Sequence, residues 1–452
     1  MSGPGLSWLG IVRLGLVQTA LGAIVVLTTS TMNRVMVVEF ALPAMLPGAL
    51  VALHHVIQMS RPRFGYGSDL GGRRTPWIVG GMIVLSLGGV GAASGTALMG
   101  TDVVWGTALA LVAFVMIGLG VGAAGTSLLV LLAKRVQANR RAAAATIVWM
   151  MMISGFAVTA GIAGHFLDPF SSARLIAVTA AVAAAAVLVT VLAVRGLEGR
   201  SPGAAADPAG TRAKPPFRAA LREVWQEPEA RRFTLFVFVS MLAYSAQDLI
   251  LEPYAGTVFG MTPGQSTQLA GMQHGGVLLG MLLVAVTGTA ARASATRLLR
   301  WWTVCGCAAS ALALFGIAWG GSAAASWPLR ENVFLLGLAN GAFAVAAIAS
   351  MMTLAGRGRA RSEGLRMGLW GGAQAIAFGL GGFLGTVAID IARQFFSDPA
   401  HAYALVFSGE AALFLYAAAL GLTVRLAASS PTGESAAPSF GEVAMTEVLQ
   451  GR

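Results

Sequence analysis

Long apolar runs follow one another along most of this chain, and they limit its possible folds more than any other feature. Of the 452 residues, 56% are hydrophobic and only 11% are charged. Because lipid offers no hydrogen-bond partners, a segment that crosses it must satisfy its own backbone groups, as a helix does. We therefore expect an all-α integral membrane protein. Twelve spans can be drawn, at residues 14–33, 41–59, 76–98, 103–132, 142–166, 173–194, 233–252, 268–290, 300–320, 332–354, 367–391 and 402–424.

The basic residues are distributed unevenly among the loops. If both termini lie in the cytoplasm, all but four of the 30 Lys and Arg residues fall on the cytoplasmic side. This asymmetry is typical of membrane proteins and sets their orientation. The net charge of +11 is spread over many short loops, whereas a nucleic-acid-binding protein concentrates basic charge on one face. We therefore expect no nucleic-acid partner.

A central segment divides the chain into two parts. It is rich in Pro, Gly and Ala, and then places Phe217, Leu221, Val224 and Trp225 at helical spacing. We predict a helix over 217–227 that lies on the inner membrane surface, or that packs against the cytoplasmic ends of the bundle. The predicted domains are an N-terminal six-helix bundle at 1–195, a cytoplasmic linker at 196–232, a C-terminal six-helix bundle at 233–426, and a disordered cytoplasmic tail at 427–452.

A short loop rich in Gly and Arg separates the second and third apolar runs. Its glycines allow a sharp reversal of the chain. Asp69 precedes Arg74 by five residues, so a carboxylate and a guanidinium can meet across the turn. Pro76 suits the first turn of the next helix, where its missing N–H costs nothing. We expect a conformational loop made by Gly65, Asp69, Gly72, Arg73 and Arg74.

The spacing of this loop resembles the signature loop of the major facilitator superfamily, in the order Gly65-x-x-x-Asp69-x-x-Gly72-Arg73-Arg74. One position departs from that signature, since the family often has a basic residue after the Asp and this chain has Leu70. The flanking sequence resembles a narrower group, the PucC/LhaA branch. That resemblance rests on Arg61-Pro62-Arg63-Phe64-Gly65-Tyr66, Thr75-Pro76-Trp77-Ile78 and Thr31-Met32-Asn33-Arg34-Val35-Met36-Val37-Val38-Glu39.

The resemblance implies a fold, a function and partners. The superfamily fold has twelve transmembrane helices in two pseudo-symmetric six-helix bundles around a central cavity. The branch implies a membrane assembly factor that binds or delivers bacteriochlorophyll, as cargo, to light-harvesting antenna polypeptides in a phototrophic bacterium. Reaction-centre or pigment-synthesis proteins and membrane lipids are further partners that it suggests. The implied location is the bacterial inner (intracytoplasmic) membrane, with several passes and both termini cytoplasmic.

Polar side chains recur on one face of the first and seventh spans, which line the cavity in this superfamily. The first carries Gln18, Gly22, Thr29 and Asn33 at helical spacing, and the seventh carries Ser240, Tyr244, Asp248 and Glu252. A charge in hydrocarbon costs about 2.5–3.5 kcal/mol on insertion scales and needs a partner or a wet cavity. We predict that Arg34 pairs with Glu39, Asp248 or Glu252. The alternative is that these charges lie in headgroup water.

Histidine provides the candidate pigment ligands. His54 and His55 lie in the second span and His274 lies in the eighth, beside Gln273. A neutral imidazole is a good axial ligand for the magnesium of a chlorin, although a histidine in a helix can equally be a hydrogen-bonded core residue. Adjacent helical residues point about 100° apart, so we expect only one of His54 and His55 to face the cavity. The predicted binding set comprises His54, His55, His274, Gln273, Arg34, Asp248 and Glu252.

The sequence contains no enzyme motif. It has no phosphate-binding Gly-Lys loop, no zinc-ligand spacing, and only two cysteines, two positions apart in one span. We therefore expect that the protein is not an enzyme and that it binds no metal ion directly. Two alternatives to pigment delivery remain: an ion-coupled transporter that exports a small solute using Asp248 or Glu252 as a proton site, and a structural partner whose outer helix faces bind antenna helices.

Overall fold

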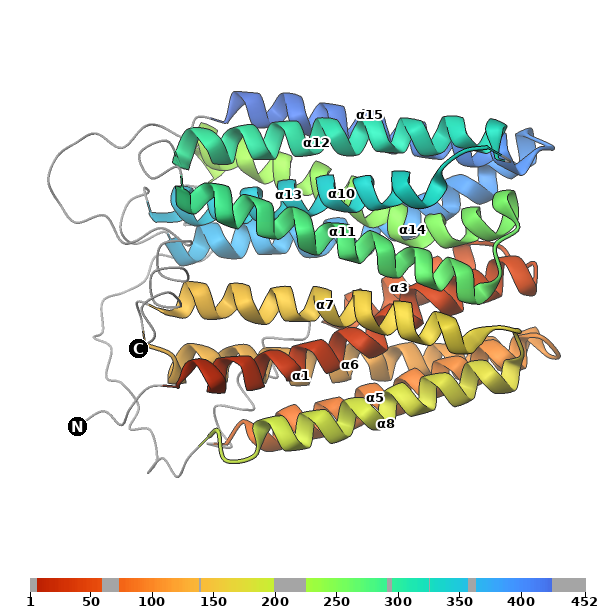
Figure 1. Ribbon diagram of the computed structural model, residues 1–452, viewed down its shortest axis with the longest axis horizontal. Coiled ribbons are helices and arrows are strands. Elements are labelled where there is room, and N and C mark those ends of the chain that lie inside the picture. Colours follow the sequence, from red (N-terminus) through yellow and green to blue (C-terminus); the bar gives the residue numbers. More distant parts are fainter. Residues whose placement is uncertain are drawn as a thin grey trace, which may run out of the picture.

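A computed structural model of the chain describes residues 6–58, 73–137, 140–198, 225–290, 295–324, 326–356 and 363–424. Within these ranges every regular element is a helix, as predicted, and the helices run side by side along one direction (Figure 1). Eleven of them are long and apolar enough to cross a membrane. α3 has 14 residues and reaches the end of a described range at Gln58. The number twelve therefore stays a prediction.

The helices have the following bounds. The first long helix comprises α1 (Trp8–Val26), the π-helical turn η1 (Leu27–Thr31), α2 (Met32–Arg34) and a second π-helical turn η2 (Val35–Glu39). The others are α3 (Met45–Gln58), α5 (Thr75–Met99), α6 (Val103–Arg135), α7 (Arg141–Leu167), α8 (Ser172–Val194), α10 (Pro228–Phe259), α11 (Pro263–Ala290), α12 (Ala295–Gly320) with the 3-10 turn η5 (Gly321–Ala323), α13 (Leu329–Gly356), α14 (Glu363–Phe395) and α15 (Pro399–Thr423).

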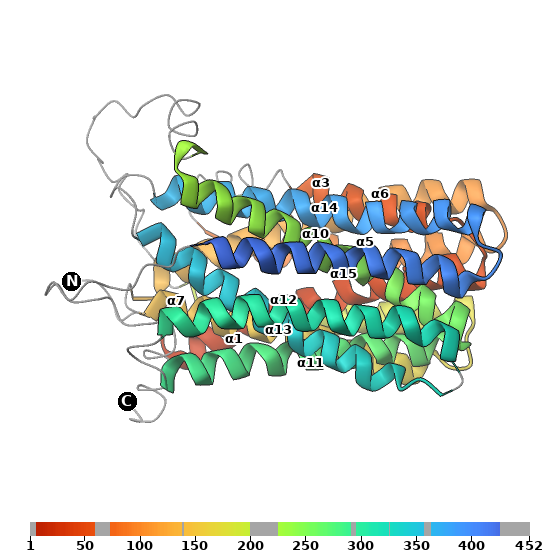
Figure 2. The ribbon, with the colours of Figure 1, turned by 90° about the horizontal axis from the view of Figure 1, so that it is seen from above.

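Two sets of helices pack around separate hydrophobic cores. One core joins α1, α3, α5, α6, α7 and α8, and the other joins α10 to α15. The sets meet mainly where α7 packs against α11 and where α3 packs against α14 (Figures 1 and 2). The start of α12 reaches the end of α15, because Arg300 donates a hydrogen bond to the carbonyl of Leu422. Between the two seams, α10 packs against the η1, α2 and η2 segments of the first long helix.

At two positions, glycine lets a neighbouring helix approach the backbone of a candidate site residue closely. A Cβ atom at Gly118 of α6 would lie 2.8 Å from the carbonyl oxygen of His54 in α3. A Cβ at Gly337 of α13 would lie 2.9 Å from the carbonyl carbon of Gln273 in α11. Since real Cβ atoms do not approach backbone this closely, both positions need glycine. The packing thereby fixes the backbone that carries His54 and Gln273.

Hydrogen bonds join the two sets of helices at one end of the molecule. Asp168, just after α7, accepts hydrogen bonds from the Thr262 hydroxyl at 2.6 Å and from the Gly264 backbone N–H at 3.1 Å. Asp390 of α14 accepts from the backbone N–H groups of Ala44 and Met45 at 2.9 and 2.7 Å, before α3 and at its start. We call this end, with Asp168 and Asp390 at its seams, the sealed end.

At the opposite end, part of the conformational loop falls within the described residues. Pro76 lies in the first turn of α5, as predicted. Glu198, which follows α8, accepts hydrogen bonds from the backbone N–H groups of Arg74 and Thr75. The predicted Asp69–Arg74 contact cannot be followed because Gly65, Asp69 and Gly72 lie outside the described residues. The same applies to most of the predicted 217–227 helix and to the predicted tail.

The environment of Glu198 shifts its ionisation. Burial alone would raise the pKa of this carboxyl, but hydrogen bonds from the Thr75 side chain and from the Arg74 and Thr75 backbone, with the Arg73 charge, lower the pKa below its usual value. A lowered folded-state pKa means that the carboxylate stabilises the fold above the unfolded pKa, and that this contribution is lost as pH falls through the folded pKa. Glu198 therefore acts as an anionic cap on the start of α5.

Glu198→Gln is expected to lower the stability by about 0.5–1 kcal/mol at neutral pH, the range for a partly exposed helix cap. Thermal unfolding midpoints in detergent would measure this effect. The difference from the wild type should shrink as pH falls below the usual range for glutamate. Glu229→Gln, at an exposed ion pair with Arg232, serves as the control. A difference that stays constant down to low pH would contradict the capping role.

Asp168→Ala is expected to open the sealed end, because it removes two hydrogen bonds between the two sets of helices. A loss of about 1–2 kcal/mol shifts a two-state equilibrium roughly fivefold to thirtyfold. Spin labels at Phe166→Cys and Phe395→Cys, in a Cys305→Ala, Cys307→Ala background, would report the separation. The distance distribution should gain a longer component. Asp102→Ala, which removes only the cap of α6, should leave it unchanged; equal distributions for the two variants would rule out a latch at Asp168.

Candidate functional site

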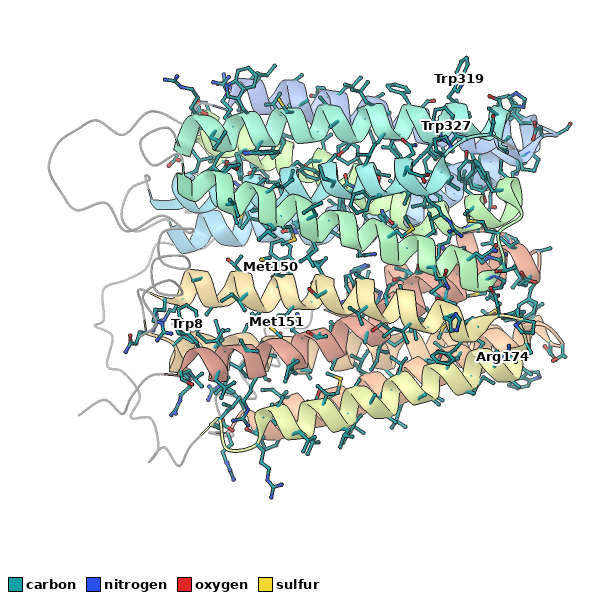
Figure 3. All side chains as sticks on the ribbon, in the orientation of Figure 1. Trp8, Met150, Met151, Arg174, Trp319 and Trp327 are labelled. Atoms are coloured by element: carbon teal, nitrogen blue, oxygen red, sulfur yellow. The ribbon has the colours of Figure 1, made fainter. Side chains whose placement is uncertain are left out.

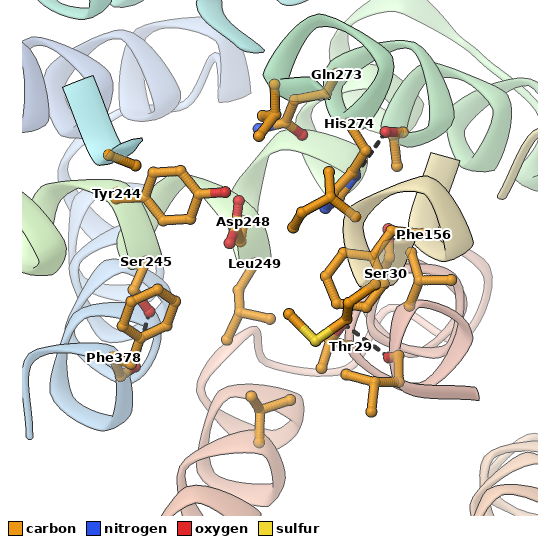
Figure 4. A pocket seen from close by; sticks show the side chains of 18 of the residues that line it. Thr29, Ser30, Phe156, Tyr244, Ser245, Asp248, Leu249, Gln273, His274 and Phe378 are labelled. Atoms are coloured by element: carbon orange, nitrogen blue, oxygen red, sulfur yellow. Dashed lines mark hydrogen bonds between the residues drawn. The ribbon is translucent and has the colours of Figure 1, made fainter. Parts of the chain in front are cut away.

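A cavity of about 230 Å³ lies between the two sets of helices, at the centre of the molecule. Its walls come from α1 and η1, α3, α7, α10, α11, α13 and α14, and most of the lining side chains are apolar. Figure 4 shows Thr29 and Ser30 on one side and Tyr244, Asp248, Gln273 and His274 on the other. An apolar chamber with a few polar groups is the usual form of a small-molecule site.

The structure brings together most of the residues that the sequence singled out. The cavity is lined by His54, His55, Asp248, Glu252, Gln273 and His274. Arg34 is not among the lining residues. The prediction that only one of His54 and His55 faces the cavity was wrong. Their rings lie 4.1 Å apart between centroids, and both residues border the same cavity, beside the contact between α3 and α14.

His274 has the geometry of a potential ligand. Its Nδ1 atom lies 2.8 Å from the carbonyl oxygen of Ala270, one turn earlier in α11. A hydrogen bond to a carbonyl requires a proton on Nδ1, so the lone pair remains on Nε2. The ring packs edge-on against Phe156 of α7, with centroids 5.0 Å apart. The backbone carbonyl and the aromatic ring together hold this imidazole in one orientation.

His54 and His55 lie on the opposite wall, in α3. His54 is buried, and its Nδ1 lies 2.7 Å from the carbonyl oxygen of Val51. His55 packs against Phe378 of α14, with ring centroids 6.3 Å apart. This pair therefore occupies the seam between α3 and α14, where the two sets of helices meet.

Asp248 forms a polar group with its neighbours in the cavity wall. The Gln273 side chain lies near the Asp248 carboxyl, and the Tyr244 ring one turn away is close enough to interact with it electrostatically. The Asp248 and Tyr244 side chains both extend from α10 toward the cavity in Figure 4. This arrangement can hold a hydrogen-bonding substituent of a guest, or a proton.

Proline in α10 explains a contact with the first long helix. The sequence places the end of the seventh span near Glu252, but α10 continues through Pro253 to Phe259. Pro253 has no N–H, so the carbonyl of Leu249, four residues earlier, loses its helical partner. The Asn33 side chain donates a hydrogen bond to that carbonyl. A polar residue of one half thus compensates for a proline in the other.

Glu252 and Arg34 have different partners. The Ser30 hydroxyl, in the π-helical turn η1, donates a hydrogen bond to the Glu252 carboxyl. Arg34 forms an ion pair with Glu39 and donates to the carbonyl oxygen of Met261 at 2.6 Å. Of the three partners predicted for Arg34, Glu39 forms the ion pair. The Arg34 side chain is 3% exposed, which contradicts the alternative of a charge dissolved in headgroup water.

Other side chains of the site were less clear from the sequence. Trp149 and Met152 of α7 line the cavity, while Met150 packs toward α11 and Met151 packs against Gly15 of α1 (Figure 3). Asp168 and Glu198 were not predicted to make contacts, because each follows a span and resembles an ordinary loop carboxylate. Among the described residues, no group of three or more His, Cys, Asp or Glu side chains could hold a metal ion.

Solved structures with a similar arrangement are membrane transporters. A bacterial homologue of the human lysosomal transporter Spinster, in an inward-facing and occupied conformation, superimposes with a TM-score of 0.64 at 16% identity, covering 92% of this chain and 96% of that chain. A peptide transporter, POT, in complex with sulfate gives a TM-score of 0.67 at 14% identity, covering 93% and 96%. These likenesses show that the fold is of the major facilitator type.

Sequence relatives come from photosynthetic bacteria. A protein of Rhodobacter capsulatus described as the bacteriochlorophyll synthase 44.5 kDa chain is 53% identical over 94% of this chain and 98% of its own length. Protein PucC of the same organism is 29% identical, covering 91% of each chain, and Protein PucC of Cereibacter sphaeroides is 29% identical, covering 82% and 81%. The PUCC protein family model matches residues 31–429. The chain is therefore a multi-pass membrane protein that belongs to the PUCC protein family.

Proposed function

We propose that this protein binds bacteriochlorophyll in its central cavity and delivers it to light-harvesting antenna polypeptides during assembly of the complex. The observation that carries the proposal is the presence of three imidazoles, His54, His55 and His274, on the wall of a mostly apolar cavity in a PUCC family member. Family membership supports a role in light-harvesting assembly. The cargo and its delivery are our inference.

His274 is the favoured axial ligand. Because Nδ1 donates to Ala270, the Nε2 lone pair is available, and a neutral imidazole nitrogen is a suitable ligand for the magnesium of a chlorin. Gln273 and Asp248 lie beside it and could hold a polar substituent of the macrocycle. Phe156, Trp149 and the methionines supply an apolar, polarizable surface for a flat ring.

The size of the cavity places a condition on the proposal. A volume of about 230 Å³ is below the roughly 300–1,000 Å³ typical of pockets for drug-sized ligands. A pigment would therefore enter only when the two sets of helices move apart, with the sealed end closed and the opposite end widened. Motion of one half against the other about a central site is the general mechanism of this transporter architecture.

The membrane arrangement is part of the proposal. We place the protein in the bacterial inner membrane, with twelve spans in two six-helix halves and both termini in the cytoplasm. The basic loops of the sequence support this orientation. We also propose that the protein is not an enzyme: it would present pigment, although one relative carries a synthase description.

Ion-coupled export of a small solute is the second candidate function. Asp248 and Glu252 both line the cavity, where a carboxyl group can bind and release a proton. Proton-linked uptake into vesicles that is lost in Asp248→Asn would favour this function. The third candidate is a structural partner of the antenna whose cavity is not used. In that case, substitutions on lipid-facing helix surfaces would abolish antenna binding, whereas substitutions in the cavity would have no effect.

Purification of the full chain in mild detergent from a pigment-making host tests the proposal. The protein should carry a chlorin absorption spectrum, and His274→Ala should reduce the bound pigment about tenfold, the effect of losing roughly 1.4 kcal/mol of ligation. His401→Ala, an exposed residue that pairs with Asp398, is the matched control. Absence of pigment from correctly folded wild-type protein, or equal pigment content in the two variants, would contradict the proposal.

A further inference from the structure

A buried polar layer crosses the C-terminal set of helices behind the cavity, and the proposed function does not use it. Among the buried polar residues of α10, α12, α13 and α15, one in each helix lies near mid-length and at a similar depth. These residues are Gln247, Ser310, Asn340 and Glu410, of which the first three are 0% exposed and the last is 3% exposed. We call them the polar layer.

Aromatic side chains close the layer toward the sealed end. Tyr254 of α10 packs against Tyr403 and Phe407 of α15, with ring centroids 5.3 and 5.1 Å apart. The Tyr254 hydroxyl donates to the carbonyl oxygen of Ile317 in α12 at 2.6 Å. Gln247 precedes Tyr254 by two turns on the same face, and Glu410 follows Phe407 by about one turn.

A second aromatic cluster closes the layer on the other side. Phe343 of α13 packs against Tyr244 of α10 and Phe414 of α15, with ring centroids 6.2 and 5.5 Å apart. Gln247, Asn340 and Glu410 each lie about one turn from these rings, on the side of the sealed end. Because α10 and α15 run in opposite directions, the two clusters place the polar layer at one depth, between two sets of rings.

Several atoms of the layer have no hydrogen-bond partner among the described residues. They are the Gln247 amide nitrogen and oxygen, the Asn340 amide nitrogen and both Glu410 carboxyl oxygens. The Ser310 hydroxyl does have one, since it lies 2.8 Å from the Asn340 amide oxygen. Buried polar atoms without partners are rare in proteins and mark bound water, ions or functional sites.

Charged groups around Glu410 do not neutralise it. Asp248 of α10 acts on it electrostatically with the same sign of charge. Other ionisable groups contact α15 away from Glu410: Tyr254 packs on Tyr403 and Phe407, and Arg393 donates to Tyr403 at 3.0 Å with Asp390 nearby, all toward the sealed end. Arg300 of α12 binds the Leu422 carbonyl at the opposite end of α15. The membrane-crossing part of α13, residues 332–351, has no charged side chain. Within the described residues, no cation is paired with Glu410.

The numbers of unpartnered donors and acceptors indicate which ligand the polar layer can bind. The unpartnered atoms are two donors, both amide nitrogens, and three acceptors, and the layer carries one uncompensated negative charge if Glu410 is ionised. One added proton converts a Glu410 oxygen into a donor and removes the charge, so that donors and acceptors can pair directly or through water. A metal cation would also cancel the charge, but among the described residues no group of three or more His, Cys, Asp or Glu side chains could hold one.

We propose that the polar layer binds a proton at Glu410. Asp248, which lies outside the layer, competes for this proton, so that the two carboxyl groups hold one proton between them. Glu410 lies in the closed layer, and Asp248 lies on the wall of the cavity. Two carboxyl groups that repel each other in a low dielectric are not ionised together. The charge that the cavity presents to a guest therefore depends on which of the two holds the proton. Exchange of cargo and exchange of a proton would be linked through this pair.

Infrared spectroscopy of the purified full chain tests this site without any pigment. The wild-type protein should show the carbonyl stretch of a protonated carboxylic acid in an apolar environment at neutral pH, and Glu410→Gln should lose that component. Glu331→Gln, the same change at an exposed position of α13, is the control and should keep it. Glu410→Asp should keep a protonated carboxyl band at a shifted frequency.

The outcomes separate the site from its alternatives. In the wild type the band should be present at neutral pH, and Asp248→Asn should make it give way at a lower pH than in the wild type, because loss of the neighbouring negative charge makes Glu410 easier to ionise. Identical wild-type and Glu410→Gln spectra would overturn the proposal. So would a carboxylate signal from Glu410 at neutral pH, and a sodium-dependent change in that signal would identify a cation site instead. None of these results depends on whether the cavity binds a chlorin.

Discussion

The cost of leaving a polar group unpaired in hydrocarbon determines how the two halves of this protein meet. Proline at position 253 frees the Leu249 carbonyl in α10, and Asn33 from the first long helix satisfies it. The buried Arg34 is neutralised by Glu39 and bound to the Met261 carbonyl across the seam. Since each partner comes from the opposite half or from a neighbouring turn, the halves are held together where these residues lie. The cavity lies between the halves where, among the described residues, no such contacts join them.

The chemistry of the cavity follows from the same constraint. Polar side chains that face it are fixed by local bonds, from Nδ1 of His274 to Ala270 and from Ser30 to Glu252, while Gln273 lies near Asp248. What these bonds leave available is an imidazole nitrogen and a carboxyl group in an otherwise apolar space. This combination suits a large apolar molecule with a central metal and polar edges, and the PUCC family membership makes a chlorin the natural candidate. The polar layer behind Asp248 adds a means of changing the charge of the wall.

Much of the fold could be predicted because hydropathy acts locally. The helical class, most span positions and the first-turn proline at position 76 follow from runs of residues and their flanks. The sequence also selected six of the residues that line one cavity, because polar residues in apolar spans are few. It could not supply the contacts: the 100° rule excluded a shared cavity for His54 and His55, yet both border it where α3 meets α14. Pro253 was read as a helix end because Asn33, its compensating partner, is more than 200 positions away. Asp168 and Glu198 look like loop residues until distant backbone N–H groups are placed beside them.

A structure of the protein purified with its pigment would test the central claim most directly. The account predicts a macrocycle between α7, α10 and α11, with its metal within bonding distance of the His274 Nε2 atom and the sealed end still closed at Asp168. Pigment found only on the lipid-facing perimeter, with the cavity unchanged and His274 turned away, would contradict it.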